Sequence, residues 1–70
     1  MKPKKETNKM IVNIYRRIED YIEEYKLADC GLAESNIDME VVNYIIGLDI
    51  RHKDRQKYIN YYHRHKVKEE

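Results

Sequence analysis

The stretch Met39-Glu-Val-Val-Asn-Tyr-Ile-Ile-Gly-Leu-Asp-Ile50 is the most apolar run in a chain that is otherwise strongly polar. If this run is helical, apolar side chains point in almost every direction around the helix. A helix that is apolar all round is normally buried by neighbouring elements. The run therefore predicts a buried helix over residues 38–50, capped by Asn36 or Asp38, and the remainder of the chain must supply the helices that cover it.

The chain offers few other means of stabilisation because it has 70 residues and a single cysteine, Cys30. A domain of this size buries only about 60% of the surface that its unfolded chain exposes. Small domains usually add a disulfide, a metal or a second subunit, and one cysteine cannot form an internal disulfide. We therefore predict a single small helical domain over residues 1–70 that self-associates as a homodimer.

A heptad pattern precedes the apolar run. Ile11, Ile18, Tyr25 and Leu32 recur every seven residues, and a second apolar row follows three residues later. Such spacing places apolar side chains on one face of a helix, at the a and d positions of a heptad. The pattern predicts a long amphipathic helix over residues 8–30. Its stripe is the candidate oligomer or partner interface, formed by Ile11, Ile14, Ile18, Tyr21, Ile22 and Tyr25.

Glycines and polar residues set the expected boundaries between the segments. Residues 1–7 are expected to form a mobile basic tail. Gly31 is expected to end the first helix and to open a connection over residues 31–37. Gly47 would lie inside the second helix, at a cost of about 1 kcal/mol relative to alanine. The polar residues that follow the apolar run predict a turn at 51–53, and one bent helix through this point is the alternative.

A basic, tyrosine-rich helix is predicted over residues 54–66, with Asp54 as its cap. Its exposed face would carry Arg, Gln and Asn, which read base edges, and Lys, which neutralises phosphates. A helix-turn-helix can be drawn over residues 39–66. However, apolar residues are missing where its second helix should bury them, and the net charge of +1 is low for a DNA-binding protein. The candidate nucleic-acid contacts are Lys53, Arg55, Gln56, Lys57, Asn60, Tyr61, Arg64 and Lys66.

Charge is segregated along the sequence, although the charged residues nearly cancel over the whole chain. Residues 1–18 contain six Lys and Arg against one Glu, and residues 19–40 contain eight Asp and Glu against one Lys. Residues 51–68 contain seven Lys and Arg against one Asp. Either these blocks attract one another within the fold or across a dimer, or one of them meets a charged partner. Mimicry of nucleic acid by the acidic block is a further alternative.

Other functional classes find little support in the sequence. Cys30, His52, His63 and His65 are the candidate metal ligands, but their spacing does not bring three or four ligands together, so neither a metal nor a cofactor is expected. No catalytic pair stands out, and so short a helical chain leaves little room for a substrate pocket. No run approaches the roughly 20 apolar residues of a membrane span, and we expect a cytoplasmic protein. The abundance of Ile, Lys, Asn and Tyr suggests an AT-rich coding source, such as a low-GC bacterium or its phage.

The sequence thus predicts an all-α fold of two or three helices, assembled as a homodimer. The leading interpretation of its function is a small non-enzymatic regulator, an adaptor or inhibitor that binds another protein as well as itself. The basis is the surplus of apolar surface and the heptad stripe, because amphipathic helices dock through anchors at helical spacing. The alternative is a DNA- or RNA-binding transcriptional regulator that uses residues 53–66.

Overall fold

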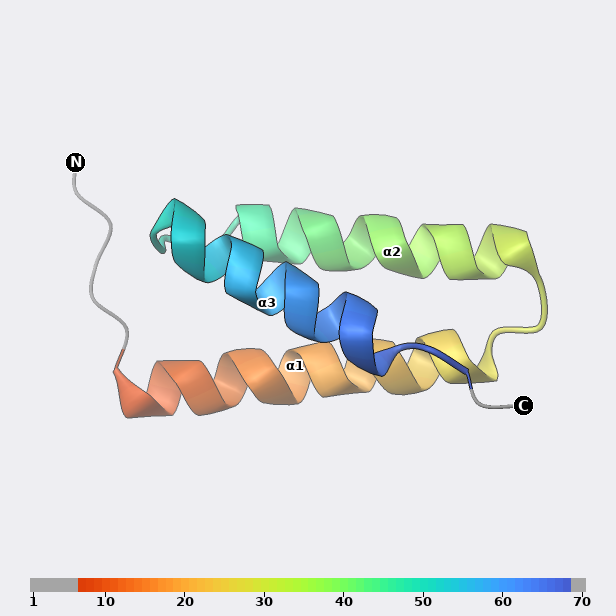
Figure 1. Cartoon of the computed structure of the whole chain (residues 1–70), viewed down its shortest axis with the longest axis horizontal. Coiled ribbons are helices and arrows are strands. Elements are labelled where there is room, and N and C mark those ends of the chain that lie inside the picture. Colours follow the sequence, from red (N-terminus) through yellow and green to blue (C-terminus); the bar gives the residue numbers. More distant parts are fainter. Residues whose placement is uncertain (1–6, 69–70) are drawn as a thin grey trace.

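A computed structural model of the chain describes residues 7–68 and contains three helices. They are α1 (Asn8–Leu27), α2 (Gly31–Ile46) and α3 (His52–His65). Figure 1 shows that α2 runs back alongside α1, and that α3 reverses again and lies across the two. Each helix contacts both of the others. The prediction of a small all-α fold is therefore confirmed, whereas the homodimer stays a prediction.

Helix α1 begins as the sequence indicates but ends earlier. The hydroxyl of Thr7 accepts a hydrogen bond from the backbone N–H of Met10 at 3.2 Å, which makes Thr7 the N-cap. The helix ends at Leu27, and Ala28 is already extended. The predicted end at residue 30 is therefore wrong, and the connection spans residues 28–30 only.

Residues 31–37, which the sequence predicts to be a connection, are helical, so that prediction is wrong. Gly31 is the first residue of α2 and not the end of α1, and its backbone is not left-handed. The extended Cys30 is the N-cap, and its carbonyl accepts from the backbone N–H of Glu34 at 3.1 Å. Extending α2 by these turns places Ile37 against the core, which a surface loop would not do.

The apolar run is divided between α2 and the turn that follows it. Gly47 is the C-cap of α2 and does not lie inside the helix. Residues 47–51 form the turn, and Ile50 within it is almost completely buried. The turn predicted at 51–53 therefore lies earlier, and α3 begins at His52, two residues before its expected start. One bent helix across this region is excluded.

The core lies along the line where the three helices meet. Val41 and Ile45 are the only residues of α2 that are fully buried, so the prediction of a helix buried all round is wrong. Tyrosine rings form part of the core and pack against it. Tyr15 lies edge-on against Tyr58, with 5.3 Å between the ring centroids. The buried apolar residues are Ile14, Ile18, Tyr21, Ile22, Val41, Ile45, Ile50, Tyr58 and Tyr62. In the part of the chain that the structure describes, no helix is long and apolar enough to cross a membrane.

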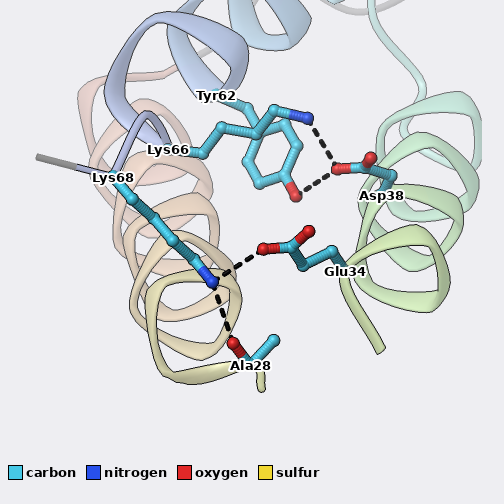
Figure 2. Close-up of polar contacts among 6 residues, drawn as sticks. All are labelled: Ala28, Glu34, Asp38, Tyr62, Lys66 and Lys68. Carbon is cyan, nitrogen blue, oxygen red and sulfur yellow. Dashed lines mark hydrogen bonds and ion pairs between the residues drawn. The ribbon is translucent and has the colours of Figure 1, made fainter. Parts of the chain in front are cut away.

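A polar cluster joins the C-terminal end of α3 to α2, and Figure 2 shows it. The hydroxyl of Tyr62 donates to Oδ1 of Asp38 at 2.6 Å, and Nζ of Lys66 approaches the same oxygen at 2.9 Å. One turn away on α2, Glu34 pairs with Nζ of Lys68 at 2.7 Å. These contacts fix the position of α3 relative to α2. We refer to Asp38, Tyr62 and Lys66 as the Asp38 cluster.

The Asp38 cluster predicts a specific dependence of stability on pH. Burial alone would raise the pKa of Asp38, but the hydrogen bonds from Tyr62 and Lys66 and the charge of Lys66 together hold it below its ordinary value of 3.8. A carboxyl group whose pKa falls on folding stabilises the fold above its unfolded pKa, and this contribution is lost as the pH falls through the folded pKa. We expect Asp38→Asn to lower the melting temperature at about pH 6, and this difference to shrink as the pH is lowered towards about 2 and Asp38 becomes protonated. An equal difference at both pH values would contradict this assignment.

Candidate nucleic-acid interface

The structure brings six of the eight predicted nucleic-acid contacts together on one side of α3. They line a surface hollow of about 680 Å³ between α3 and α1. Tyr15 from α1 and two histidines at the ends of α3, His52 and His65, complete its lining. The six are Lys53, Gln56, Lys57, Asn60, Tyr61 and Arg64.

Helical geometry explains why these residues share one face. Asp54, Tyr58 and Tyr62 follow one another at intervals of four residues and are the buried residues of α3. Lys53, Gln56, Lys57, Asn60 and Arg64 are related by steps of three, four or seven residues, so their side chains share another side of the helix. Lys53 and Arg64 are both exposed, eleven residues apart and therefore about three turns apart along one side of the helix.

The other two predicted contacts, Arg55 and Lys66, lie on the side of α3 that faces α2. The Nη2 atom of Arg55 donates to the carbonyl of Leu48 at 3.1 Å, and its Nε atom is buried without a hydrogen-bond partner among the described residues. Lys66 belongs to the Asp38 cluster and lies over the ring of Tyr25 at 4.6 Å. Both side chains hold the bundle together, and neither lines the hollow.

The lining of the hollow carries positive charge and no carboxylate. The lining contains three cations, Lys53, Lys57 and Arg64. Among the described residues only Lys57 has an acidic neighbour, since its Nζ lies 3.9 Å from Oδ1 of Asp54. Asp54 itself is buried and also accepts from Nε of Arg51 at 3.0 Å. Within residues 7–68, neither Lys53 nor Arg64 forms an ion pair. Their charges are therefore available to an anionic ligand.

Two exposed amides lie between these cations. The Nε2 atom of Gln56 donates to Oδ1 of Asn60 at 3.2 Å, which holds the two side chains side by side on consecutive turns. The oxygen of Gln56 and the nitrogen of Asn60 are not used in this bond. Such an acceptor and donor are the groups with which amide side chains recognise the edge of adenine.

Aromatic rings form the α1 side of the hollow. Tyr61 packs against His65 with ring centroids 4.2 Å apart, and Tyr15 meets Tyr61 edge-on at 4.9 Å. The hydroxyl of Tyr61 donates to Oε1 of Glu19 at 3.2 Å. Burial and then this hydrogen bond raise the pKa of Tyr61, so the hydroxyl remains a donor to Glu19 at neutral pH. The side chain of Tyr61 is therefore held in place at the edge of the hollow by these contacts.

The predicted partner interface on α1 lies mostly inside the chain. Of its six residues, Ile14, Ile18, Tyr21 and Ile22 are buried in the core, while Ile11 and Tyr25 are half-buried. The fold itself thus consumes this stripe. Leu32, which the heptad pattern includes, lies on α2 and is 73% exposed. Large apolar side chains are instead exposed on the outer face of α2, where Met39 is 63% and Ile46 is 59% exposed.

Sequence reasoning did not identify the three other residues that line the hollow. Tyr15 is adjacent to Ile14 of the predicted stripe on α1, and residue spacing does not show that a third helix will cover that edge of α1. From the sequence, His52 and His65 are candidate metal ligands, a role that does not place them beside Tyr61 or Tyr15. Within residues 7–68, no group of three or more His, Cys, Asp and Glu side chains could hold a metal ion, and Cys30 is a free, exposed thiol.

Comparison with known proteins found no relative. No family model, no curated protein and no solved structure matches the chain. The fold and the chemistry of its surface are therefore the basis for assigning a function.

Proposed function

We propose that the protein binds duplex DNA through the exposed side of α3. We call this surface the α3 basic face and define it by Lys53, Gln56, Lys57, Asn60 and Arg64. The observation that supports it is the gathering of these side chains along one hollow whose lining contains no carboxylate. The cations would neutralise phosphates, which supplies most of the affinity of such complexes, and the two amides would contact base edges.

The shape of the α3 basic face favours a duplex over a single strand. An exposed α-helix fits the major groove of B-DNA, which is about 12 Å wide. Binding of unpaired bases relies on aromatic rings with a free face. In this hollow Tyr61 is packed by His65 and Tyr15 and tied to Glu19, which leaves it poorly placed for stacking.

The mode of presentation differs from a helix-turn-helix. In that motif, two helices joined by a short turn meet at about 90–120° and the second enters the groove. Here α2 and α3 run in opposite directions (Figure 1), and the turn between them spans residues 47–51. This turn is longer than the three to four residues of that motif, so the proposal does not rest on the helix-turn-helix drawn from the sequence.

The sequence favours a protein-binding regulator, but most of the surface predicted for that function is buried inside the fold. Four of the six residues that would form that surface are core residues. That function stays a prediction, and it would require a different face of the molecule.

Reversing two charges of the α3 basic face tests the proposal. The double variant Lys53→Glu with Arg64→Glu is expected to bind mixed-sequence duplex DNA about a thousandfold more weakly, because each reversal replaces an attraction of ~1 kcal/mol with a repulsion of similar size. The slope of log affinity against log salt should fall by about two. Fluorescence anisotropy at roughly 50 and 200 mM salt measures both quantities.

A matched control separates the site from the overall charge. Arg16→Glu with Lys26→Glu makes the same change in net charge at exposed positions of α1 outside the hollow. This control should retain most of the affinity. Equal losses in the two double variants, or no binding of the unaltered chain at the lower salt, would overturn the proposal. Stronger binding of single-stranded RNA than of duplex would reassign the ligand.

A further inference from the structure

The outer face of α2 is apolar and uncharged where a solvent-facing helix is normally polar. Leu32, Met39 and Ile46 are between 59% and 73% exposed and follow one another at intervals of seven residues. We call these three residues the α2 stripe. The side chains that surround them on this face are Ser35, Asn36, Val42 and Asn43, none of which is charged.

We propose that the chain forms a homodimer in which the α2 stripes of two copies pack against each other. The two α2 helices run parallel in this pair. Seven-residue spacing is the repeat at which one helix meets another over its length, with a small crossing angle. Leu32, Met39 and Ile46 would occupy the a positions of this pair, and Ser35 and Val42 the d positions. The stripe spans 15 residues, and its two ends lie about 21 Å apart along the helix.

The absence of charge is what fits the stripe to its own copy. A two-fold interface is formed by the same patch on both subunits. In a parallel pair each residue therefore lies near its own counterpart, and any charge on the stripe would face the same charge. Elsewhere on the bundle, the exposed faces of α1 and α3 carry many charges. The α2 stripe is thus the face best suited to self-association.

The flanks of the stripe determine the orientation of the two copies. On the side towards α1, Asp20, Glu24 and Glu40 border the groove between the helices, together with the single cation Arg17. On the side towards α3, the carboxylates of α2 are paired with Lys66 and Lys68.

An antiparallel pair would place the acidic flank against its own copy. A parallel pair places it against the flank that carries the lysines. Like-charge juxtaposition disfavours the first arrangement, and we therefore assign the parallel one.

Self-association through α2 does not compete with the proposed DNA-binding surface. The hollow of the α3 basic face is lined by residues of α1 and α3 alone, whereas the stripe belongs to α2. The two surfaces can be tested separately, because a variant of one leaves the other intact.

The mass of the protein in solution, measured by sedimentation equilibrium, tests the pairing. The chain has a mass of 8.6 kDa. When the protein concentration is raised about a hundredfold, the average mass of the species in solution should rise towards twice that value. Met39→Lys places a charge at the centre of the stripe and should raise the dissociation constant at least about tenfold. Val12→Lys is the matched control, since Val12 is 58% exposed on α1, and it should behave as the unaltered chain does. A single-chain mass at every concentration, or equal effects of the two variants, would overturn the proposal.

A cysteine at residue 46 tests the orientation. In a Cys30→Ser background, Ile46→Cys should form a disulfide between copies on mild oxidation, because parallel helices bring the two positions together. In an antiparallel pair the two positions would be about 21 Å apart along the helices, beyond the Cα separation of roughly 7 Å that a disulfide tolerates. A dimer that does not cross-link would contradict the parallel assignment. A DNA titration of Met39→Lys with unchanged affinity per chain would show that the two surfaces are independent.

Discussion

Replacing Ile18 with aspartate is expected to leave the chain unfolded at room temperature. Ile18 is completely buried between the three helices. Truncating such a side chain to alanine costs about 2–5 kcal/mol, and an unpaired buried carboxylate costs still more. A domain of 70 residues has only about 4–10 kcal/mol of stability. Loss of the helical signal in far-ultraviolet circular dichroism measures the effect.

The matched control for this variant is Val12→Asp. Val12 lies on the same helix but is exposed, so its replacement should change the free energy of unfolding by no more than about 0.5 kcal/mol. A folded Ile18→Asp chain with an unchanged urea midpoint would contradict the position of the core. Unfolding of both variants would indicate that α1 tolerates no added charge, wherever it is placed.

The core residues of α1 could be predicted from the sequence because their periodicity is strong. Ile14, Ile18, Tyr21 and Ile22 lie on one face at helical spacing, and packing against α2 and α3 makes use of that face. Periodicity could not show which helices pack against this face. The same stripe fits a second chain as well as the chain's own helices, and it is the fold that decides between them.

The boundaries of α2 could not be predicted because both glycines act differently from their usual roles. Glycine after a helix favours a left-handed cap, yet Gly31 starts α2 in ordinary helical geometry, following an extended Cys30. Gly47 ends the helix without a left-handed backbone. Because α2 starts earlier and ends earlier than expected, its outer face exposes Leu32, Met39 and Ile46, and the apolar run over residues 39–50 does not form one buried helix.

The candidate site could be predicted in part, since one helix face is defined by its own residues. Lys53, Lys57 and Arg64 share a face with Gln56 and Asn60 whatever covers the opposite side. Arg55 and Lys66 lie outside the hollow because they bond to Leu48 and Asp38, and residue spacing does not show where those two groups lie. The lining contributed by Tyr15 likewise depends on how α1 and α3 pack, which residue spacing alone does not specify.

Truncation of Tyr62 to alanine is expected to lower the free energy of unfolding by about 3–5 kcal/mol, the usual cost of removing a buried aromatic ring. The ring is almost completely buried near the C-terminal end of α3, and it packs edge-on against Tyr25 at 6.3 Å. Tyr62→Phe retains the ring and loses only the hydrogen bond to Asp38. Because Asp38 is partly exposed, that loss should be about 1–2 kcal/mol.

A double-mutant cycle assigns the smaller loss to its cause. Tyr62→Phe and Asp38→Asn should destabilise the fold by less together than the sum of their separate effects, because both weaken the same hydrogen bond. Tyr25→Phe is the control, since among the described residues the hydroxyl of Tyr25 forms no hydrogen bond, and it should leave the urea midpoint nearly unchanged. Strictly additive effects would mean that the contact at 2.6 Å contributes nothing to stability. In that case the orientation of the α3 basic face would depend on the packing of the tyrosine rings and on the remaining contacts of α3, such as Arg55 with Leu48 and Tyr61 with Glu19.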